Sequence, residues 1–277
     1  MRAEGAMRTR LEAPAVEPLS IERTSVALSG ATRTYPARSR SADPTEALAD
    51  VTLSVARGEV LAVVGPSGCG KSTLLELVCG LQEPDRGEVS INGNRAAAAR
   101  LSQCAYMAQR DLLLPWRDAI ANAALALECQ GVGRREARRR AAPLFARFGL
   151  DSFERALPGE LSGGMRQRVA FLRTLLAGRP VLCLDEPFAA LDSITRAAMQ
   201  EWLADALAGE PRTVLCVTHD VEEALFLGDR VAVLSGRPGR VVAELSVDLP
   251  RPRPRRETVT GARFVELKEQ ALEALAA

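Results

Sequence analysis

The chain has 277 residues, which is enough for one large domain or two modest ones around a substantial core. Hydrophobic residues make up 47% and charged residues 26%, proportions that exclude a disordered or fibrous chain and indicate a globular one. The 36 basic and 35 acidic residues give a formal charge of +1, so no overall field would recruit nucleic acid or anionic lipid.

The chain is expected neither to span a membrane nor to be secreted. Apolar runs such as residues 60–64 are far shorter than the roughly 20 residues that a membrane-spanning helix needs. Residues 1–18 lack the apolar core and the cleavage site of a secretory signal, so we expect the protein to remain in the cytosol.

The first elements in chain order predict a tail, a small sheet, and a strand followed by a helix. Residues 1–20 are mixed and proline-containing, and we expect a flexible tail before a domain that spans residues 21–248. Short β-prone pieces around a polar insert predict a small antiparallel sheet within residues 25–56. Residues 59–65 form an apolar run that stops in a glycine-rich turn, and residues 71–79 favour a helix.

The remaining elements predict a helical subdomain and a parallel sheet. Helical spacing of alanine, leucine and arginine places the subdomain at about residues 110–170. Three short β-rich runs then alternate with helical stretches, as in a parallel sheet covered by helices; they lie at residues 180–184, 213–218 and 230–234. A turn at residues 235–239 predicts a hairpin. Residues 249–277 are expected to form a linker, with surface arginines at 251–256, and a short amphipathic helix.

Cysteine, histidine and lysine are sparse, and this limits the chemistry of the chain. The six cysteines lie mostly in apolar runs without a CxxC pair or a Cys/His ligand spacing, so we interpret them as reduced, mostly buried thiols. His219 is the only histidine, which excludes a histidine-rich metal site within one chain. Lys71 and Lys268 are the only lysines in a chain that otherwise uses arginine.

Residues 65–72, Gly-Pro-Ser-Gly-Cys-Gly-Lys-Ser, fit the phosphate-loop pattern GxxxxGK[ST] between a predicted strand and a predicted helix. In such a loop, backbone N–H groups and the helix N-terminus bind phosphate. Lys71 would reach the β- and γ-phosphates, and the Ser72 hydroxyl would bind Mg²⁺. The alternative is a chance match in a glycine-rich turn. The predicted nucleotide-binding residues of this segment are Gly65, Pro66, Ser67, Gly68, Cys69, Gly70, Lys71, Ser72 and Thr73.

A second candidate element is a buried strand that ends in two carboxylates, Asp185 and Glu186, at the sheet edge where parallel sheets bind ligands. Asp185 would hold Mg²⁺, and Glu186 would orient or deprotonate an attacking water. The alternative is that both carboxylates cap a helix at Pro187. The presence of Lys71 favours the nucleotide site.

Residues 161–167, Leu-Ser-Gly-Gly-Met-Arg-Gln, are similar to the signature sequence of the ATP-binding-cassette (ABC) ATPase family. The order of motifs along the chain also resembles that family: the phosphate loop, Gln109, the signature, Asp185 with Glu186, residues 190–192, and His219. The resemblance covers about residues 25–245. It implies an α/β fold, with a P-loop NTPase (RecA-like) core, an N-terminal antiparallel β subdomain and an inserted α-helical subdomain.

The resemblance implies ATP and Mg²⁺ as cofactors and a second, identical cassette as a partner. Cassettes of this family pack head to tail, so Ser162, Gly163 and Gly164 would bind the ATP held by the other cassette. Asp192 would then bridge the two cassettes.

The resemblance also assigns roles to three residues that no general motif identifies. Tyr35 would stack on adenine, although an aromatic residue in a β-rich segment is often only a packing residue. Gln109 would contact Mg²⁺ or the attacking water. His219 would contact the γ-phosphate.

Taken together, the sequences of these motifs are similar to those of importer ATPases of the nitrate, sulfonate, taurine and pyrimidine or thiamine-precursor group. This implies transmembrane permease subunits, a separate solute-binding protein, and a peripheral position on the cytoplasmic face of the inner membrane. Residues 111–116 would line the groove that receives a helix of the permease; the alternative is a buried loop whose leucines belong to the core. The solute would contact no residue of this chain.

Two other classes are weaker interpretations. One is an ABC ATPase without a transport function that acts on a soluble or nucleic-acid partner. An ABC ATPase that handles nucleic acid would carry a long insert, whereas Ser162 follows Gln109 by only 53 positions, so we expect no nucleic-acid partner. A P-loop kinase or nucleotide switch would leave residues 162–164 and His219 without a role.

Overall fold

The computed structural model describes residues 24–37, 43–209 and 212–276. The predicted tail at residues 1–20 therefore lies outside the described residues. An antiparallel sheet comes first, with strand order β2-β1-β4. Its strands are β1 (Thr24–Tyr35), β2 (Thr45–Ala56) and β4 (Arg86–Ile91).

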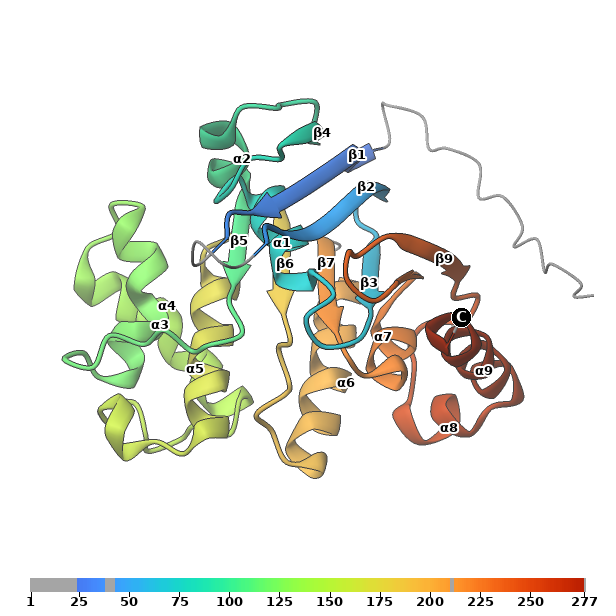
Figure 1. Ribbon diagram of the computed structural model, residues 1–277. Helices are drawn as coiled ribbons and strands as arrows, with labels where there is room; N and C mark the ends of the chain where they lie inside the picture. The colour runs from blue at the N-terminus through green and yellow to red at the C-terminus, as the bar shows by residue number, and fades with distance from the viewer. Residues whose placement is uncertain (1–23, 38–42, 210–211, 277) are drawn as a thin grey trace, which may run out of the picture.

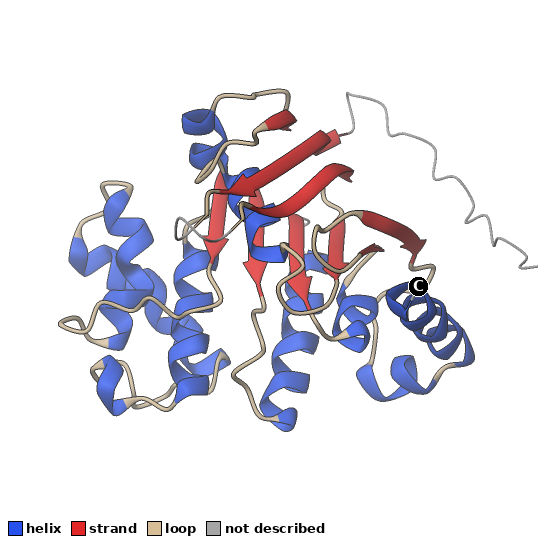
Figure 2. Ribbon diagram, viewed as in Figure 1, coloured by secondary structure: helices blue, strands red, loops and turns tan. Residues whose placement is uncertain are grey.

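A second, six-stranded sheet forms the centre of the molecule, in the order β5-β6-β7-β3-β8-β9 (Figures 1 and 2). All neighbouring pairs are parallel except β8 with β9. Its strands are β3 (Val60–Val64), β5 (Cys104–Met107), β6 (Val181–Asp185), β7 (Thr213–Thr218), β8 (Arg230–Leu234) and β9 (Val241–Ser246). Three of them match the short β-rich runs predicted from the sequence.

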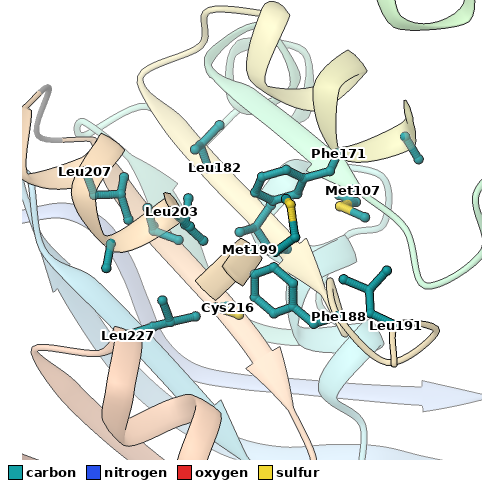
Figure 3. Close-up of a cluster of buried hydrophobic side chains, with 14 of the residues drawn as sticks. Met107, Phe171, Leu182, Phe188, Leu191, Met199, Leu203, Leu207, Cys216 and Leu227 are labelled. Carbon is teal, nitrogen blue, oxygen red and sulfur yellow. The ribbon is translucent and has the colours of Figure 1, made fainter. Parts of the chain in front are cut away.

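Because neighbouring residues of a strand point to opposite faces, each central strand contributes to two cores. Leu61 and Val63 of β3 pack on one face with α1 (Lys71–Cys79) and the antiparallel sheet. Ala62 and Val64 belong to the core on the other face. That core contains Phe171, Phe188 and Met199 beneath the sheet (Figure 3). The apolar strands seen in the sequence are thus buried on both faces.

Helices cover the sheet and form a lobe at one end of it. The lobe contains α3, α4 and α5 (Figure 1), and a short 3-10 turn, Pro158–Glu160, precedes α5. The helices are α1 (Lys71–Cys79), α2 (Ala97–Gln103), α3 (Ala119–Cys129), α4 (Arg134–Arg147), α5 (Gly163–Leu176), α6 (Ser193–Gly209), α7 (Val221–Leu227), α8 (Arg255–Thr260) and α9 (Ala262–Ala276). No helix among the described residues is both long and apolar enough to cross a membrane.

The C-terminal segment differs in one respect from the expected surface linker. Arg253 is only 5% exposed. Its Nη1 donates to the carbonyl oxygens of Phe226 and Gly228, both at 2.8 Å. The last carbonyls of α7 have no partner within their own helix, and Arg253 supplies donors for them. The expectation of a surface arginine is therefore wrong at this position, whereas the predicted amphipathic helix is present as α9, with Phe264, Leu267 and Ala271 buried.

Candidate active site

The predicted phosphate loop joins β3 to α1, as its sequence context requires. Gly70, the last loop residue, has φ +106°, and a Cβ there would lie 2.6 Å from the Ala47 carbonyl oxygen, so both conformation and space demand glycine. No side chain caps the first turn of α1, which begins at Lys71. The amides of that turn are therefore left for a ligand, and an anion suits them best.

Lys71 lies at the base of this loop and is only 7% exposed. Its Nζ donates to the carbonyl oxygens of Gly65 at 2.7 Å and Pro66 at 3.2 Å. The same Nζ is 3.9 Å from Oε1 of Glu186. The phosphate loop and the carboxylate strand, 115 positions apart in the chain, are thus brought together around one ammonium group.

Asp185 and Glu186 follow one another at the end of β6 but have different surroundings. Asp185 accepts hydrogen bonds from the hydroxyl groups of Tyr106, at 3.3 Å, and Ser72. Burial raises the pKa of Asp185 above its ordinary value. Glu186 has φ +49°, a left-handed conformation that a glutamate rarely adopts. This turn in the backbone separates the two carboxylates.

His219 lies just beyond the end of β7, next to β6 in the sheet. Its Nδ1 is 2.5 Å from Oε2 of Glu186, so Lys71 and His219 contact different oxygens of one carboxylate. The imidazole is 59% exposed, while the Glu186 side chain is 11% exposed. A shielded carboxylate beside an accessible imidazole is suited to orienting a water molecule and handling its proton.

The loop and the strand ends line a cleft of about 770 Å³. Tyr35 stands at its edge, where its hydroxyl accepts from Gln82 at 2.9 Å and is 3.2 Å from the Thr73 hydroxyl oxygen. The Arg33 guanidinium lies over the ring, 5.3 Å from its centroid. The cleft residues are Tyr35, Pro36, Asp43, Thr45, Ala47, Ser67, Gly68, Gly70, Lys71, Ser72, Thr73, Gln109, Asp185, Glu186 and Arg237.

The signature residues Ser162, Gly163 and Gly164 do not line this cleft. Ser162 is the N-cap of α5, and its hydroxyl oxygen accepts from the amide of Met165 at 3.2 Å. Asp192 in turn caps the start of α6, because its Oδ1 accepts from the amide of Thr195 at 3.0 Å. Ser162 and Asp192 are both exposed. Gly65, Pro66, Cys69 and His219 do not line the cleft themselves. The other predicted site residues form two separate groups, one in the cleft and one outside it.

Sequence reasoning missed Arg237, which lies in the turn between β8 and β9. Its Nε donates to the Gly68 carbonyl oxygen at 3.0 Å, and its side chain lines the cleft. Gly239 in the same turn packs so closely on the loop that a Cβ there would lie 2.2 Å from the Cys69 carbonyl oxygen. The only signal in the sequence was the turn itself, since 169 positions separate Arg237 from Gly68.

Comparison with known proteins agrees with this geometry. The sequence profile described as ABC transporter matches residues 48–189. The aliphatic sulfonates import ATP-binding protein SsuB 2 of Burkholderia cenocepacia is 44% identical over 220 residues, 79% of this chain and 80% of that protein. The taurine import ATP-binding protein TauB of Rhizobium johnstonii is 45% identical over 218 residues, 77% of this chain and 82% of that protein. The formylaminopyrimidine import ATP-binding protein ThiZ of Halalkalibacterium halodurans is 44% identical over 197 residues, 71% of this chain and 76% of that protein.

A solved structure has the same fold. The ATP-binding cassette MJ0796, as a dimer in a post-hydrolysis state with ADP and Pi, matches with a TM-score of 0.73 at 30% identity, over 81% of this chain and all of that one. The predicted fold class, a P-loop core with a β subdomain and a helical subdomain, is confirmed. With this similarity in both sequence and fold, the chain belongs to the ABC transporter family, as one of its ATP-binding and ATP-hydrolysing cassettes.

Proposed function

We propose that the protein is the ATPase subunit of an ABC importer and energises uptake of a small solute through a separate membrane permease. The observation that carries the proposal is that Lys71 and His219 both contact the carboxylate of Glu186, which lines the cleft, in a chain so similar to importer ATPases. By that similarity, the solute is of the sulfonate, taurine or pyrimidine type.

The phosphate loop and Tyr35 would hold the nucleotide. The loop amides bind the phosphates, and the Lys71 ammonium exchanges the carbonyl oxygens of Gly65 and Pro66 for the β- and γ-phosphates. Because Arg33 lies over one face of the Tyr35 ring, the adenine would stack on the other face.

The donor set beside the loop fits Mg²⁺. Asp185, Ser72 and Gln109 line the cleft and offer oxygen atoms, and this hard ion prefers oxygen ligands. Burial disfavours the Asp185 carboxylate, and a bound cation would offset that cost. When bound, Mg²⁺ neutralises charge on the β- and γ-phosphates.

Glu186 would act on the attacking water. Its carboxylate accepts or orients the water proton, while His219 fixes the carboxylate through Oε2 and contacts the γ-phosphate. After hydrolysis, His219 would lose its contact with the γ-phosphate, and this loss would change the contacts of the loop after β7.

A second, identical cassette would complete the site. Ser162, Gly163 and Gly164 lie outside the cleft of their own chain, and the uncovered start of α5 is suited to the ATP phosphates of a partner. Asp192 would lie at the same junction between cassettes.

The loop of residues 111–116 would receive the permease. Leu112 and Trp116 are 57% and 75% exposed, which is unusual for large apolar side chains. Trp116 also lines a groove of about 340 Å³, together with Arg117, Asp118, Ala121, Glu128, Arg134 and Arg138. Binding there would hold the protein at the cytoplasmic face of the membrane, with a separate solute-binding protein completing the importer.

The first experiment identifies the partner. The tagged protein is isolated from gently solubilised membranes of its native cell, and co-purifying proteins are identified by mass spectrometry. We expect a multi-span permease in stoichiometric amount. Recovery of only soluble or nucleic-acid-bound partners would contradict the transport function while leaving ATP hydrolysis intact.

Two variants, one in the loop of residues 111–116 and one outside it, are compared in the same assay. Trp116→Glu should greatly reduce permease recovery, because it places a charge on an apolar contact surface. Val242→Glu, at a 49% exposed position on β9, is the control and should leave recovery unchanged. Both should retain the ATPase rate of the isolated protein. Equal recovery with both variants would place the permease elsewhere.

A further inference from the structure

Three cysteines that are far apart in the sequence meet inside the protein. Cys79 ends α1, Cys104 begins β5, and Cys183 lies in the middle of β6. Their three sulfur atoms all lie within 4.8 Å of one another. The sequence shows no ligand spacing, because each sulfur comes from a different element.

The packing of α1 on the sheet creates this cluster. Cys104 of β5 pairs in register with Val181, so Cys104 and Cys183 lie on neighbouring strands two residues out of register. Cys183 belongs to the core on the α1 face, and Cys79 reaches the same core from the helix. Cys79 and Cys183 are at most 1% exposed, while Cys104 is half-buried. The cluster is therefore shielded, with one sulfur near the surface.

The ligand set limits which ion could be held. Among the described residues, no histidine or carboxylate joins the three sulfurs in this group. Structural Zn²⁺ sites have four ligands, whereas hard ions such as Mg²⁺ and Ca²⁺ require oxygen. Three sulfurs around one ion at about 2.3 Å would be about 4 Å apart, which is compatible with the observed spacing. A soft, three-coordinate ion such as Cu(I) meets these conditions.

A buried cation lies next to the cluster. Arg100, in the helix directly before Cys104, is only 1% exposed, and its charge acts on the Cys104 thiol. Its Nη2 pairs with Glu83 at 2.8 Å, but its Nε is buried without a hydrogen-bond partner. A buried guanidinium with unused donor capacity would offset the negative charge of a metal–thiolate centre.

We propose that Cys79, Cys104 and Cys183 form a three-thiolate site for a thiophilic metal ion of the Cu(I) class. Each thiol releases its proton as its sulfur binds the ion, and neither the sulfurs nor the ion changes oxidation state. The bound ion would tie α1, which begins at Lys71, to β5 and to β6, which ends at Asp185. The site itself does not depend on ATP hydrolysis or on a permease.

The test measures binding and ligands rather than activity. The reduced full-length protein is titrated with Cu(I) under anaerobic conditions against a chromophoric Cu(I) chelator, and X-ray absorption of the loaded protein counts the ligands. We expect one Cu(I) per chain in a three-coordinate environment that contains sulfur only. A site with two ligands, with nitrogen or oxygen ligands, or with an affinity no better than that of free thiols would overturn the proposal.

Cysteine variants locate the site. Cys104→Ser, at the half-buried position, should weaken Cu(I) binding by about 100-fold or more, since even loss of groups that only orient a metal ligand costs about 10- to 100-fold. Cys129→Ser, at an exposed cysteine outside the cluster, is the control and should retain the site. Cys183 is more deeply buried than Cys104, so Cys183→Ala is used only if circular dichroism shows that the variant folds. Unchanged affinity in Cys104→Ser, or loss of the ion in Cys129→Ser, would assign the cluster to ordinary core packing.

Discussion

At the scale of single residues, the active site depends on polar groups held in places that ordinarily disfavour them. Lys71 is 7% exposed, and Glu186 has a left-handed backbone at φ +49°. Such conformations persist only where surrounding structure enforces them. Here the amide of Glu186 donates to the Val217 carbonyl oxygen at 2.9 Å, so the neighbouring strand fixes the turn.

Lys71→Ala should weaken ATP binding by about 10- to 100-fold, because hydrogen bonds to a charged group contribute about 1.5–3 kcal/mol. Equilibrium binding of a fluorescent ATP analogue measures this. Lys268→Ala, which removes the only other lysine, is the control and should bind normally. Unchanged affinity in Lys71→Ala would remove Lys71 from the nucleotide site.

Glu186→Gln should lower the rate of ATP hydrolysis by about 100-fold or more and preserve ATP binding, since the amide cannot accept a proton. Its size and its hydrogen bond to His219 are nearly unchanged, so folding should be normal. A steady-state phosphate-release assay gives the rate. Rapid hydrolysis by this variant would contradict the role proposed for Glu186.

The burial of Glu223 makes the stability of the folded protein depend on pH. It is 4% exposed, and burial, followed by the charge of Asp220, raises its pKa from 4.5 to about 8. The folded protein therefore favours the protonated acid, and this contribution to stability is lost as pH rises from 4.5 through about 8. Glu223→Gln should remove that loss. Urea unfolding at pH 6 and pH 9, about 2 units below and about 1 unit above the shifted pKa, measures the free energy of unfolding. Between these two pH values it should fall further in the wild-type protein than in the variant. Equal decreases in the two proteins would refute the role assigned to Glu223.

At the scale of elements, α5 links the surface signature to the core. Its first residues carry the predicted signature, while Phe171 further along is 1% exposed. The Phe171 ring lies 5.9 Å from Phe148, 6.0 Å from Phe188 and 6.2 Å from Trp202, measured between centroids. The side chain of Arg173 extends from the same helix to the carbonyl oxygens of Asp111 and Leu112, at 2.7 and 2.8 Å. One helix thus connects the predicted signature to the loop of residues 111–116, where we propose that the permease binds.

Phe171→Ala should lower the free energy of unfolding by about 3–5 kcal/mol, because it leaves a cavity among packed aromatic rings. Phe153→Ala, at a position that is 41% exposed, should cost about 1 kcal/mol or less. Urea denaturation of both proteins makes the comparison. Similar losses would mean that the aromatic cluster does not carry this stability.

At the scale of the whole molecule, the separation of the two groups of predicted site residues is consistent with the proposed pairing with a second copy. The cleft holds the phosphate loop, but the signature at the start of α5 lies outside it. ATP would contact both groups only in a dimer, and hydrolysis of the ATP would allow the dimer to dissociate.

Glu186→Gln should therefore form a dimer in the presence of ATP, because bound nucleotide is not consumed. Light scattering after size-exclusion chromatography measures the mass. Adding Ser162→Arg to this variant should prevent the dimer, since a bulky side chain would obstruct the partner's phosphates, while ATP binding to the monomer continues. A dimer that forms equally well in the double variant would exclude the head-to-tail arrangement.

Local pattern alone identified much of this protein. The strand–loop–helix around Lys71 and the carboxylates after an apolar strand require only neighbouring residues, since hydrogen-bonding geometry and side-chain periodicity act over a few positions. The order of the motifs along the chain added the resemblance to a known family. The pattern predicted a parallel sheet covered by helices, because apolar strands alternating with helices pack in few ways. The P-loop core with its two subdomains was implied by the family resemblance.

Only the tertiary structure decided which distant residues meet. The contact of Arg237 with Gly68, the buried position of Arg253 and the cluster of three cysteines each join segments that are separate in the sequence. Sequence shows that a cysteine or an arginine lies in an apolar or proline-rich run, but not what faces it across a sheet. Those contacts follow from strand order and helix placement, and both are set by burial of the whole apolar surface rather than by any local signal.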